Sequence, residues 1–215
     1  GCTLMAYVQT SDYWFAFQIG DGKCVSLTKV SDKLECNKPI PWDERCFLNK
    51  TTSLCDSQAI DGFRYCYQGD GSFPVAVFLG SDGIDDTYGD EDGLYNFYVE
   101  LYKIILQRGA KEAKKELKKT LPIISKRGSK DDMSIACVYD DSNSIETIDL
   151  LIKYQISQLE KDVIEVQNKI EQLKQKISNL NDNVNLSSSE QIVLNYAQKD
   201  VDELMKKLNQ LNDKK

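Results

Sequence analysis

The chain has 215 residues, of which 41% are hydrophobic and 9% aromatic, so a wholly disordered chain is excluded. Its 27 basic and 34 acidic residues give a formal net charge of −7. That balance argues against nucleic-acid and membrane partners, because polyanions and anionic lipids attract clustered Lys and Arg. The chain has no histidine, which excludes Ser-His-Asp and Cys-His catalysis and every histidine-containing zinc site.

The seven cysteines are scattered, and no two of them form a Cys-x-x-Cys pair. Their spacing fits neither a zinc ribbon nor a redox dithiol, which favours free thiols in a reducing compartment. No apolar run approaches the ~20 residues needed to span a bilayer. The first residues also lack the charged-then-apolar pattern of a signal peptide. The sequence therefore predicts a cytoplasmic protein.

The first part of the chain opens with short β-rich runs, predicted at 3–10, 13–19, 23–28, 63–68 and 75–79. Gly20-Asp21-Gly22 joins the second run to the third and predicts a tight hairpin, since glycine permits the positive φ of such turns. The uninterrupted apolar run at 75–79 indicates a strand that is buried on both faces and central in its sheet.

Helical patterns follow the strands. A helix is predicted at 91–107, after the acidic residues 90–92 that suit a helix N-terminus. A second is predicted at 110–120, where Pro122 disfavours its continuation. A last strand is predicted at 133–139. Strands, then helices, then a returning strand predict an α+β fold or layered sandwich.

From about residue 144 the apolar residues follow a heptad pattern. One series recurs every seven residues and a second is offset by three: Ile156, Val163, Ile170 and Ile177, with Ile152, Leu159, Val166, Leu173 and Leu180. After a polar spacer at 181–186 a further apolar series resumes at Leu194, Ala197, Val201, Leu204, Leu208 and Leu211. The pattern predicts an antiparallel coiled-coil helical hairpin over 144–215. A parallel dimer is the alternative, because β-branched residues at a and leucine at d also favour it.

Three aspartates stand out by their setting. Asp82 follows the buried run and precedes a glycine, a position where a carboxylate can reach a ligand or metal. Asp131 lies just before the last predicted strand, and Asp21 lies at the tip of the predicted hairpin. Taken singly, each has a purely structural alternative: a helix cap for Asp82, a loop residue for Asp131 and a turn residue for Asp21.

Four motifs in order carry a resemblance to a known family: Gly1-Cys2-Thr3, Ile19-Gly20-Asp21-Gly22, Leu79-Gly80-Ser81-Asp82-Gly83-Ile84 and Gly128-Ser129-Lys130-Asp131-Asp132-Met133-Ser134-Ile135. Together they resemble the C-terminal half of the metal-dependent (type 2C) Ser/Thr protein phosphatases, particularly the bacterial branch, over residues 1 to about 140. The resemblance implies an α+β fold: a layered α-β-β-α sandwich, incomplete at its N-terminus, followed here by the α-helical coiled-coil hairpin.

The resemblance also implies a site. Asp82 and Asp131 match metal-binding carboxylates of a binuclear Mn²⁺ or Mg²⁺ centre, and Asp21 matches a ligand of a third, weaker ion. The complete site would hold two or three ions, and a metal-activated water, with no catalytic side chain, would attack a phosphoserine or phosphothreonine protein. The family's N-terminal half supplies a carboxylate that bridges the two metals, and we expect that segment to lie outside this chain.

We therefore expect two domains, the C-terminal part of a phosphatase domain at 1–143 and a helical hairpin at 144–215. The expected function is that of a metal-dependent protein Ser/Thr phosphatase, present as a truncated chain that is inactive alone. The alternative is a non-catalytic, phosphatase-like interaction module. In either case residues 144–215 could bind a protein partner or self-associate.

Overall fold

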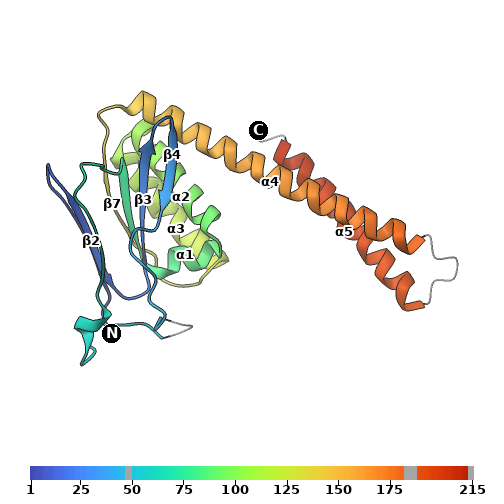
Figure 1. The fold of residues 1–215 in the computed structure, drawn as a ribbon, viewed down its shortest axis with the longest axis horizontal. Helices are drawn as coiled ribbons and strands as arrows, with labels where there is room; N and C mark the ends of the chain where they lie inside the picture. Colours follow the sequence, from blue (N-terminus) through green and yellow to red (C-terminus); the bar gives the residue numbers. More distant parts are fainter. Residues whose placement is uncertain (47–49, 182–187, 213–215) are drawn as a thin grey trace. The chain divides into compact units, whose positions relative to one another are not determined.

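The computed structural model describes residues 1–46, 50–181 and 188–212 and divides into two compact units, Gly1–Ile152 and Lys153–Lys215 (Figure 1). Helix α4 (Ser144–Asn181) begins where the heptad pattern starts. Its first turns belong to the first unit, where Thr147, Leu150 and Leu151 are buried. The domain boundary at 143/144 stays a prediction.

The first unit contains two antiparallel sheets. The smaller sheet has the order β1-β2-β5, with bounds β1 (Leu4–Gln9), β2 (Trp14–Ile19) and β5 (Arg64–Gln68). The larger sheet has the order β4-β3-β6-β7, with bounds β4 (Lys33–Asn37), β3 (Lys23–Val30), β6 (Ala76–Gly80) and β7 (Ile135–Tyr139). Strand β6 lies between β3 and β7 and is buried at four of its five residues. The prediction of a central, buried strand at 75–79 is therefore confirmed.

The predicted hairpin at Gly20-Asp21-Gly22 is wrong. Strand β2 is paired on both edges, with β1 and with β5, so no edge is left for β3. The turn instead carries the chain from the smaller sheet into the larger one. The strand that does form a hairpin with β3 is β4, which the sequence analysis did not predict; the two are joined at Ser31, whose φ is 53°.

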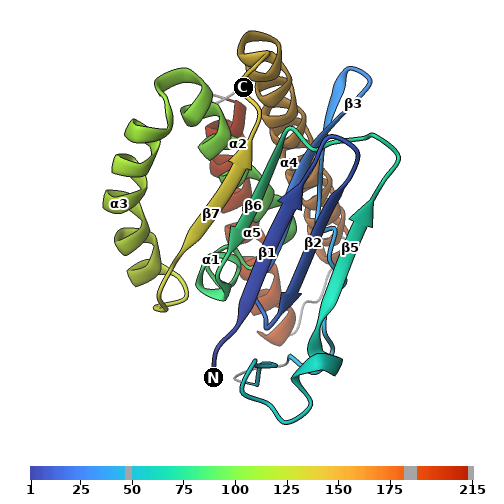
Figure 2. The ribbon, with the colours of Figure 1, turned by 90° about the vertical axis from the view of Figure 1, so that its left-hand side faces the viewer.

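The two sheets pack face to face through a buried cluster formed by Trp14, Ala16, Cys24, Ile40 and Val77. The other face of the larger sheet is covered by three helices, α1 (Asp82–Tyr88), α2 (Glu91–Arg108) and α3 (Ala110–Arg127) (Figures 1 and 2). The ring of Phe78 on β6 stacks on Tyr98 of α2 with centroids 4.7 Å apart. The core therefore has two parts, one on each face of the larger sheet.

Helix α2 begins as predicted: the Asp90 carboxylate accepts a hydrogen bond from the Gly93 N–H at 2.6 Å. The predicted end of the next helix near residue 120 is wrong, because α3 continues through Pro122 to Arg127. Proline removes one N–H donor from a helix. Here the carbonyl four residues earlier belongs to the exposed Lys118, so water can take the place of the lost donor.

The second unit consists of the remainder of α4 together with α5 (Ser188–Asn212). The two helices pack through Val166, Ile170 and Val201, which are buried, and through partly buried neighbours: Leu159, Val163, Leu173, Ile177, Leu204 and Leu208. Residues 182–186 of the predicted spacer, and the side chains of the heptad residues Leu180, Leu194 and Leu211, lie outside the described residues. No helix within the described ranges is long and apolar enough to cross a membrane.

Candidate functional site

A cleft of about 410 Å³ opens beside the turn that joins the two sheets. Its lining comes from both sheets and from the start of α1: Thr3, Met5, Ile19, Asp21, Gly22, Thr51, Leu79, Ser81, Asp82, Ser134, Ile135 and Ala136. Two of the three predicted site residues, Asp21 and Asp82, therefore face the same cavity. Hydroxyl and carboxylate groups make up its polar lining, as expected of a site for a cation or a phosphate ester.

Asp82 is the first residue of α1 and is separated from the end of the central strand β6 only by Ser81. One carboxylate oxygen accepts a hydrogen bond from the Gly83 N–H at 2.8 Å. Partial burial raises the pKa of the Asp82 carboxyl, and the negative charges of Asp21 and Asp131 raise it further, against the opposing effect of that hydrogen bond. The charge of Asp82 is thus unfavourable in its present surroundings, and a cation would relieve it.

Asp131 lies on the segment between α3 and β7, which is fastened to the start of α1 by hydrogen bonds. The Ser129 hydroxyl donates to the Gly83 carbonyl at 2.9 Å, and the Ser81 hydroxyl donates to the Asp132 carbonyl at 3.2 Å. A Cβ atom at Gly83 would lie only 2.6 Å from the Asp132 carbonyl oxygen. Glycine after Asp82 therefore lets this segment approach the start of α1.

The turn that carries Asp21 is held from several sides. The Gln18 side-chain amide donates to the carbonyls of Gly20 and Gly22, at 3.2 and 2.8 Å. The Gly20 N–H donates to the Thr52 hydroxyl at 3.1 Å, and the Arg64 guanidinium donates to the Gly20 carbonyl. Gly20 has a φ of 110°, and a Cβ there would clash with Thr3 at 2.4 Å. These contacts fix the backbone on which Asp21 sits.

Behind the turn lies Asp43, whose side chain is 4% exposed. It accepts hydrogen bonds from Arg45 at 2.8 Å and from the Thr52 hydroxyl at 3.2 Å, and lies 3.6 Å from the Arg64 guanidinium. Burial alone would raise the pKa of Asp43, but hydrogen bonds from Arg45 and the charge of Arg64 outweigh it and hold the pKa below its usual value. Thr52 and Arg64 link this carboxylate to the Asp21 turn.

The role of Asp43 could not be predicted from the sequence. Its partner Arg64 lies on a different segment of the chain, and no local pattern joins the two residues. The local sequence offers only an Asp two residues before an Arg, in a stretch without helical or strand periodicity.

Lys23 occupies the opposite side of the same turn. Its ammonium group donates to the Asp21 carbonyl at 2.9 Å, pairs with Asp85 at 3.0 Å and lies 3.8 Å from the centroid of the Trp42 ring. Because this cation is already neutralised by Asp85 and stacked on an aromatic face, its main effect here is to anchor the turn.

The donor chemistry fits a hard divalent cation only in part. Carboxylate oxygens suit Mg²⁺ and Mn²⁺. Within the described ranges, however, no three His, Cys, Asp or Glu side chains come close enough together to hold a metal ion. The described carboxylates therefore do not form a full ligand set by themselves, so we derive no catalytic step from them alone.

Comparison with known proteins identifies the family of this chain. The family model described as protein phosphatase 2C matches residues 1–122, more than half of the chain. The chain therefore belongs to the protein phosphatase 2C family, whose members are metal-dependent and act on phosphoproteins. Asp21 and Asp82 lie inside the matched range and Asp131 lies beyond it. No curated protein and no solved structure matches the chain.

Proposed function

We propose that this chain is the C-terminal part of a metal-dependent Ser/Thr protein phosphatase of the bacterial branch, acting in the cytoplasm. Asp82 and Asp131 would be ligands of the Mn²⁺ or Mg²⁺ pair, and Asp21 a ligand of a third ion. The observation that carries the proposal is the shared cleft of Asp21 and Asp82, together with the effect of the Asp131 charge on the Asp82 carboxyl.

Bound metals would supply an activated water that attacks the phosphorus of a phosphoserine or phosphothreonine side chain. The protein's own contribution is positional. Hydrogen bonds from Ser129 and Ser81 hold the Asp131 segment against the start of α1. The contacts of Gln18, Thr52 and Arg64 hold the turn of Asp21.

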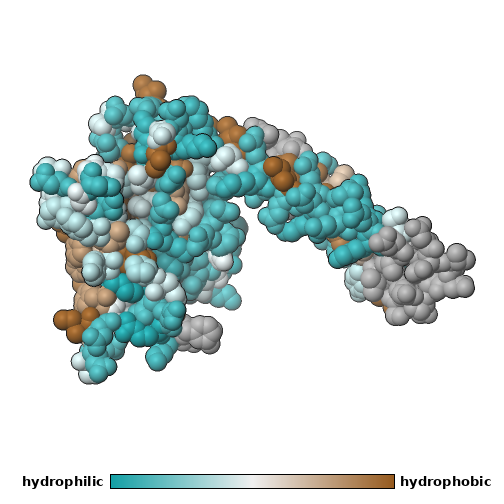
Figure 3. All heavy atoms as spheres, in the orientation of Figure 1, coloured by the Kyte–Doolittle hydropathy of each residue, from teal (hydrophilic) through white to brown (hydrophobic). Residues whose placement is uncertain are grey.

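We infer further that the phosphatase domain, which we assign to residues 1–143, is completed by protein beyond these residues. The partial ligand set calls for at least one more carboxylate, one that bridges the two ions. Among the described residues of the first unit, no helix covers the outer face of the smaller sheet, where Tyr65 is 65% and Tyr67 58% exposed. Figure 3 draws apolar atoms gathered over the part of this unit where Figure 1 places β2. A four-layered α-β-β-α sandwich would cover this face.

Residues 144–215 would form a coiled-coil helical hairpin, which the buried contacts between α4 and α5 support. A second candidate function follows from the partial ligand set: a non-catalytic, phosphatase-like module that binds a protein through this hairpin.

A phosphatase assay separates the two functions. The chain alone should hydrolyse p-nitrophenyl phosphate weakly or not at all with Mn²⁺, because its described residues offer only a partial ligand set. Extension by the residues encoded in frame upstream of Gly1 should give Mn²⁺-dependent turnover of a phosphothreonine peptide. Asp82→Ala in the extended protein should abolish that turnover, whereas Asp12→Ala, a change in an exposed turn, should preserve it. An extended protein without phosphatase activity would support the interaction module.

A further inference from the structure

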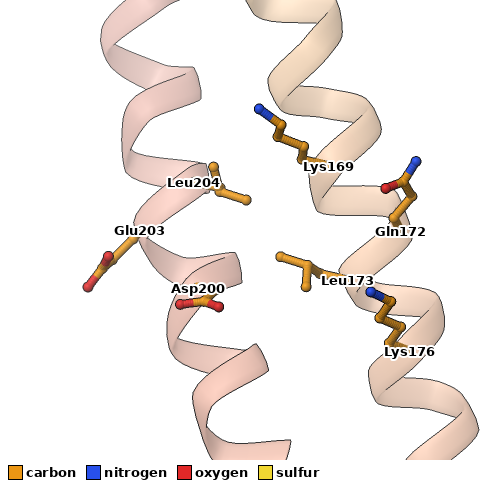
Figure 4. Close-up of a pocket in the computed structure, with 7 residues that line it drawn as sticks. All are labelled: Lys169, Gln172, Leu173, Lys176, Asp200, Glu203 and Leu204. Atoms are coloured by element: carbon orange, nitrogen blue, oxygen red, sulfur yellow. The ribbon is translucent and has the colours of Figure 1, made fainter. Parts of the chain in front are cut away.

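The two-helix unit contains a groove that the phosphatase site does not use. It has a volume of about 560 Å³ and lies between α4 and α5 (Figure 4). Leu173 and Leu204 point into the space between the helices and form its apolar floor. Above this floor, each helix contributes a rim of polar side chains.

The two rims carry opposite charge. Helix α4 lines the groove with Lys169, Gln172 and Lys176, and helix α5 lines it with Asp200 and Glu203. Lys169 pairs with Glu165, and Lys199 lies 3.9 Å from Glu203. These pairs lie within single helices and all four side chains are more than half exposed, so they screen the rims only weakly.

The acidic rim continues into apolar residues along α5. Tyr196 precedes Asp200 by four residues and Ile192 precedes Tyr196 by four, so all three lie on the same face of the helix. Tyr196 is 65% exposed and Ile192 is 56% exposed. An apolar floor between charged rims, with aromatic and aliphatic side chains beside it, is the composition of a helix-docking surface.

We propose that this groove binds the same groove of a second copy of the chain, so that two α4/α5 units form an antiparallel four-helix bundle. In a two-fold arrangement the same patch meets itself, and the surface must be complementary to its own rotated copy. Here the basic α4 rim of one copy faces the acidic α5 rim of the other, and this pairing occurs twice. Leu173, Leu204 and Tyr196 of both copies fill the space between the rims.

A partner with a helix of uniform charge would leave one rim facing like charge, which is costly at an interface. The self-pairing avoids this cost because each copy presents one rim of each sign. The proposal concerns only the second unit and does not depend on the phosphatase function.

Sedimentation equilibrium of the full chain tests the proposal. At about 100 μM, a concentration that detects even weak association, the chain should have twice its monomer mass of 24.4 kDa. The double change Lys169→Glu with Lys176→Glu makes both rims acidic and should weaken the dimer at least about 100-fold, because like charges then face each other across the interface. Asp200→Lys with Glu203→Lys makes both rims basic and should weaken the dimer to the same extent.

The decisive measurement is a mixture of the two charge-changed chains. One has two acidic rims and the other two basic rims, so they should form a heterodimer although neither forms a homodimer. The matched control is Lys174→Glu with Lys206→Glu, which alters two exposed lysines that do not line the groove and should leave the dimer intact. Far-UV circular dichroism of each variant shows whether its helices persist.

A monomeric wild-type chain at this concentration would overturn the proposal. It would also be overturned if the mixture stayed monomeric while both variants kept their helices. One variant could lose its helices when it is measured by itself. Recovery of both helicity and dimer mass in the mixture would then support the proposal, and failure to recover both would count against it.

Discussion

The two units of the molecule are stabilised in different ways. In the first unit, contacts join residues far apart in sequence: the Trp14 indole N–H donates to the Ser72 carbonyl at 3.1 Å, and Gly20 donates to Thr52. In the second unit, the core of Val166, Ile170 and Val201 belongs to repeating positions of two helices. The long-range contacts of the first unit fix the positions of individual atoms, as a metal centre requires. The repeated contacts between α4 and α5 instead produce a long surface, which suits docking.

This difference can be measured because the tryptophans report on one unit only. The chain has two, Trp14 and Trp42, and both belong to the first unit. Tryptophan fluorescence therefore follows the unfolding of the sheets, while far-UV circular dichroism also contains α4 and α5. If the units are stabilised separately, a core mutation should shift only one of these signals.

The largest effect is expected for Phe78→Ala. Phe78 is fully buried on the central strand β6 and stacks on Tyr98. Its removal should lower the free energy of unfolding of the first unit by about 4 kcal/mol through lost burial and a cavity. Urea denaturation followed by tryptophan fluorescence measures this loss. A loss below about 1 kcal/mol would mean that the core between sheet and helices tolerates a cavity far better than is usual.

The next effect is expected for Ile170→Ala in the second unit. Ile170 is 5% exposed in the cluster between α4 and α5. The change should destabilise the packing of these helices by about 3 kcal/mol. The part of the far-UV transition that comes from α4 and α5 should then shift to lower urea concentration, while tryptophan fluorescence unfolds as in the wild type. Lys174→Ala, an exposed position on the same helix, is the control and should change neither signal.

The same contrast explains how much of the fold could be predicted. Heptad spacing correctly placed Val166, Ile170 and Val201 at buried positions, because helix periodicity determines which residues share a face. It was wrong for Ile152 and Ile156 at the start of the series, which are 40% and 38% exposed. The strands at 13–19 and 23–28 were also found locally, but their distant partners were not: β2 pairs with β5, and β3 pairs with β6. Strand β4 was missed because Leu34 is the only fully buried residue in it.

The candidate site likewise contains residues that could be predicted from the sequence and residues that could not. Asp82 and Asp21 are marked by short motifs with glycine, and both reach one cleft. The network of Asp43, Thr52 and Arg64 that holds the Asp21 turn has no such local mark, because its members come together only through the tertiary fold.

That network yields the third prediction. Asp43→Asn should lower the free energy of unfolding of the first unit by about 2 kcal/mol at pH 7, because the nearly buried Arg64 loses its counter-charge. The pKa of Asp43 is lowered in the folded state, so the carboxylate's stabilising effect is present above its unfolded pKa of about 3.9. The effect is lost as the pH falls through the folded pKa.

Urea denaturation of the wild type and of Asp43→Asn across this pH range tests the sign. The two curves should differ at pH 7 and converge in acid. The matched control is Asp12→Asn, a carboxylate in an exposed turn, which should change stability little. A difference between wild type and Asp43→Asn that persisted unchanged in acid would mean that the aspartate acts by shape and not by charge.

The smallest and most informative effect is expected at Asp82. Burial and the charges of Asp21 and Asp131 raise the pKa of this carboxyl, so its ionised form is a cost to the folded state. Without metal, Asp82→Asn should therefore stabilise the first unit by about 0.5 kcal/mol at pH 7. That gain should vanish below the unfolded pKa of about 3.9, where the wild-type carboxyl is neutral as well.

The same change, Asp82→Asn, should remove the Mn²⁺-dependent turnover of the extended protein. A stabilising change that removes activity would distinguish a carboxylate kept for its ligand from a residue kept for folding. A variant less stable than the wild type at pH 7 would show instead that the hydrogen bond from the Gly83 N–H outweighs the like charges, and that Asp82 serves the structure of α1.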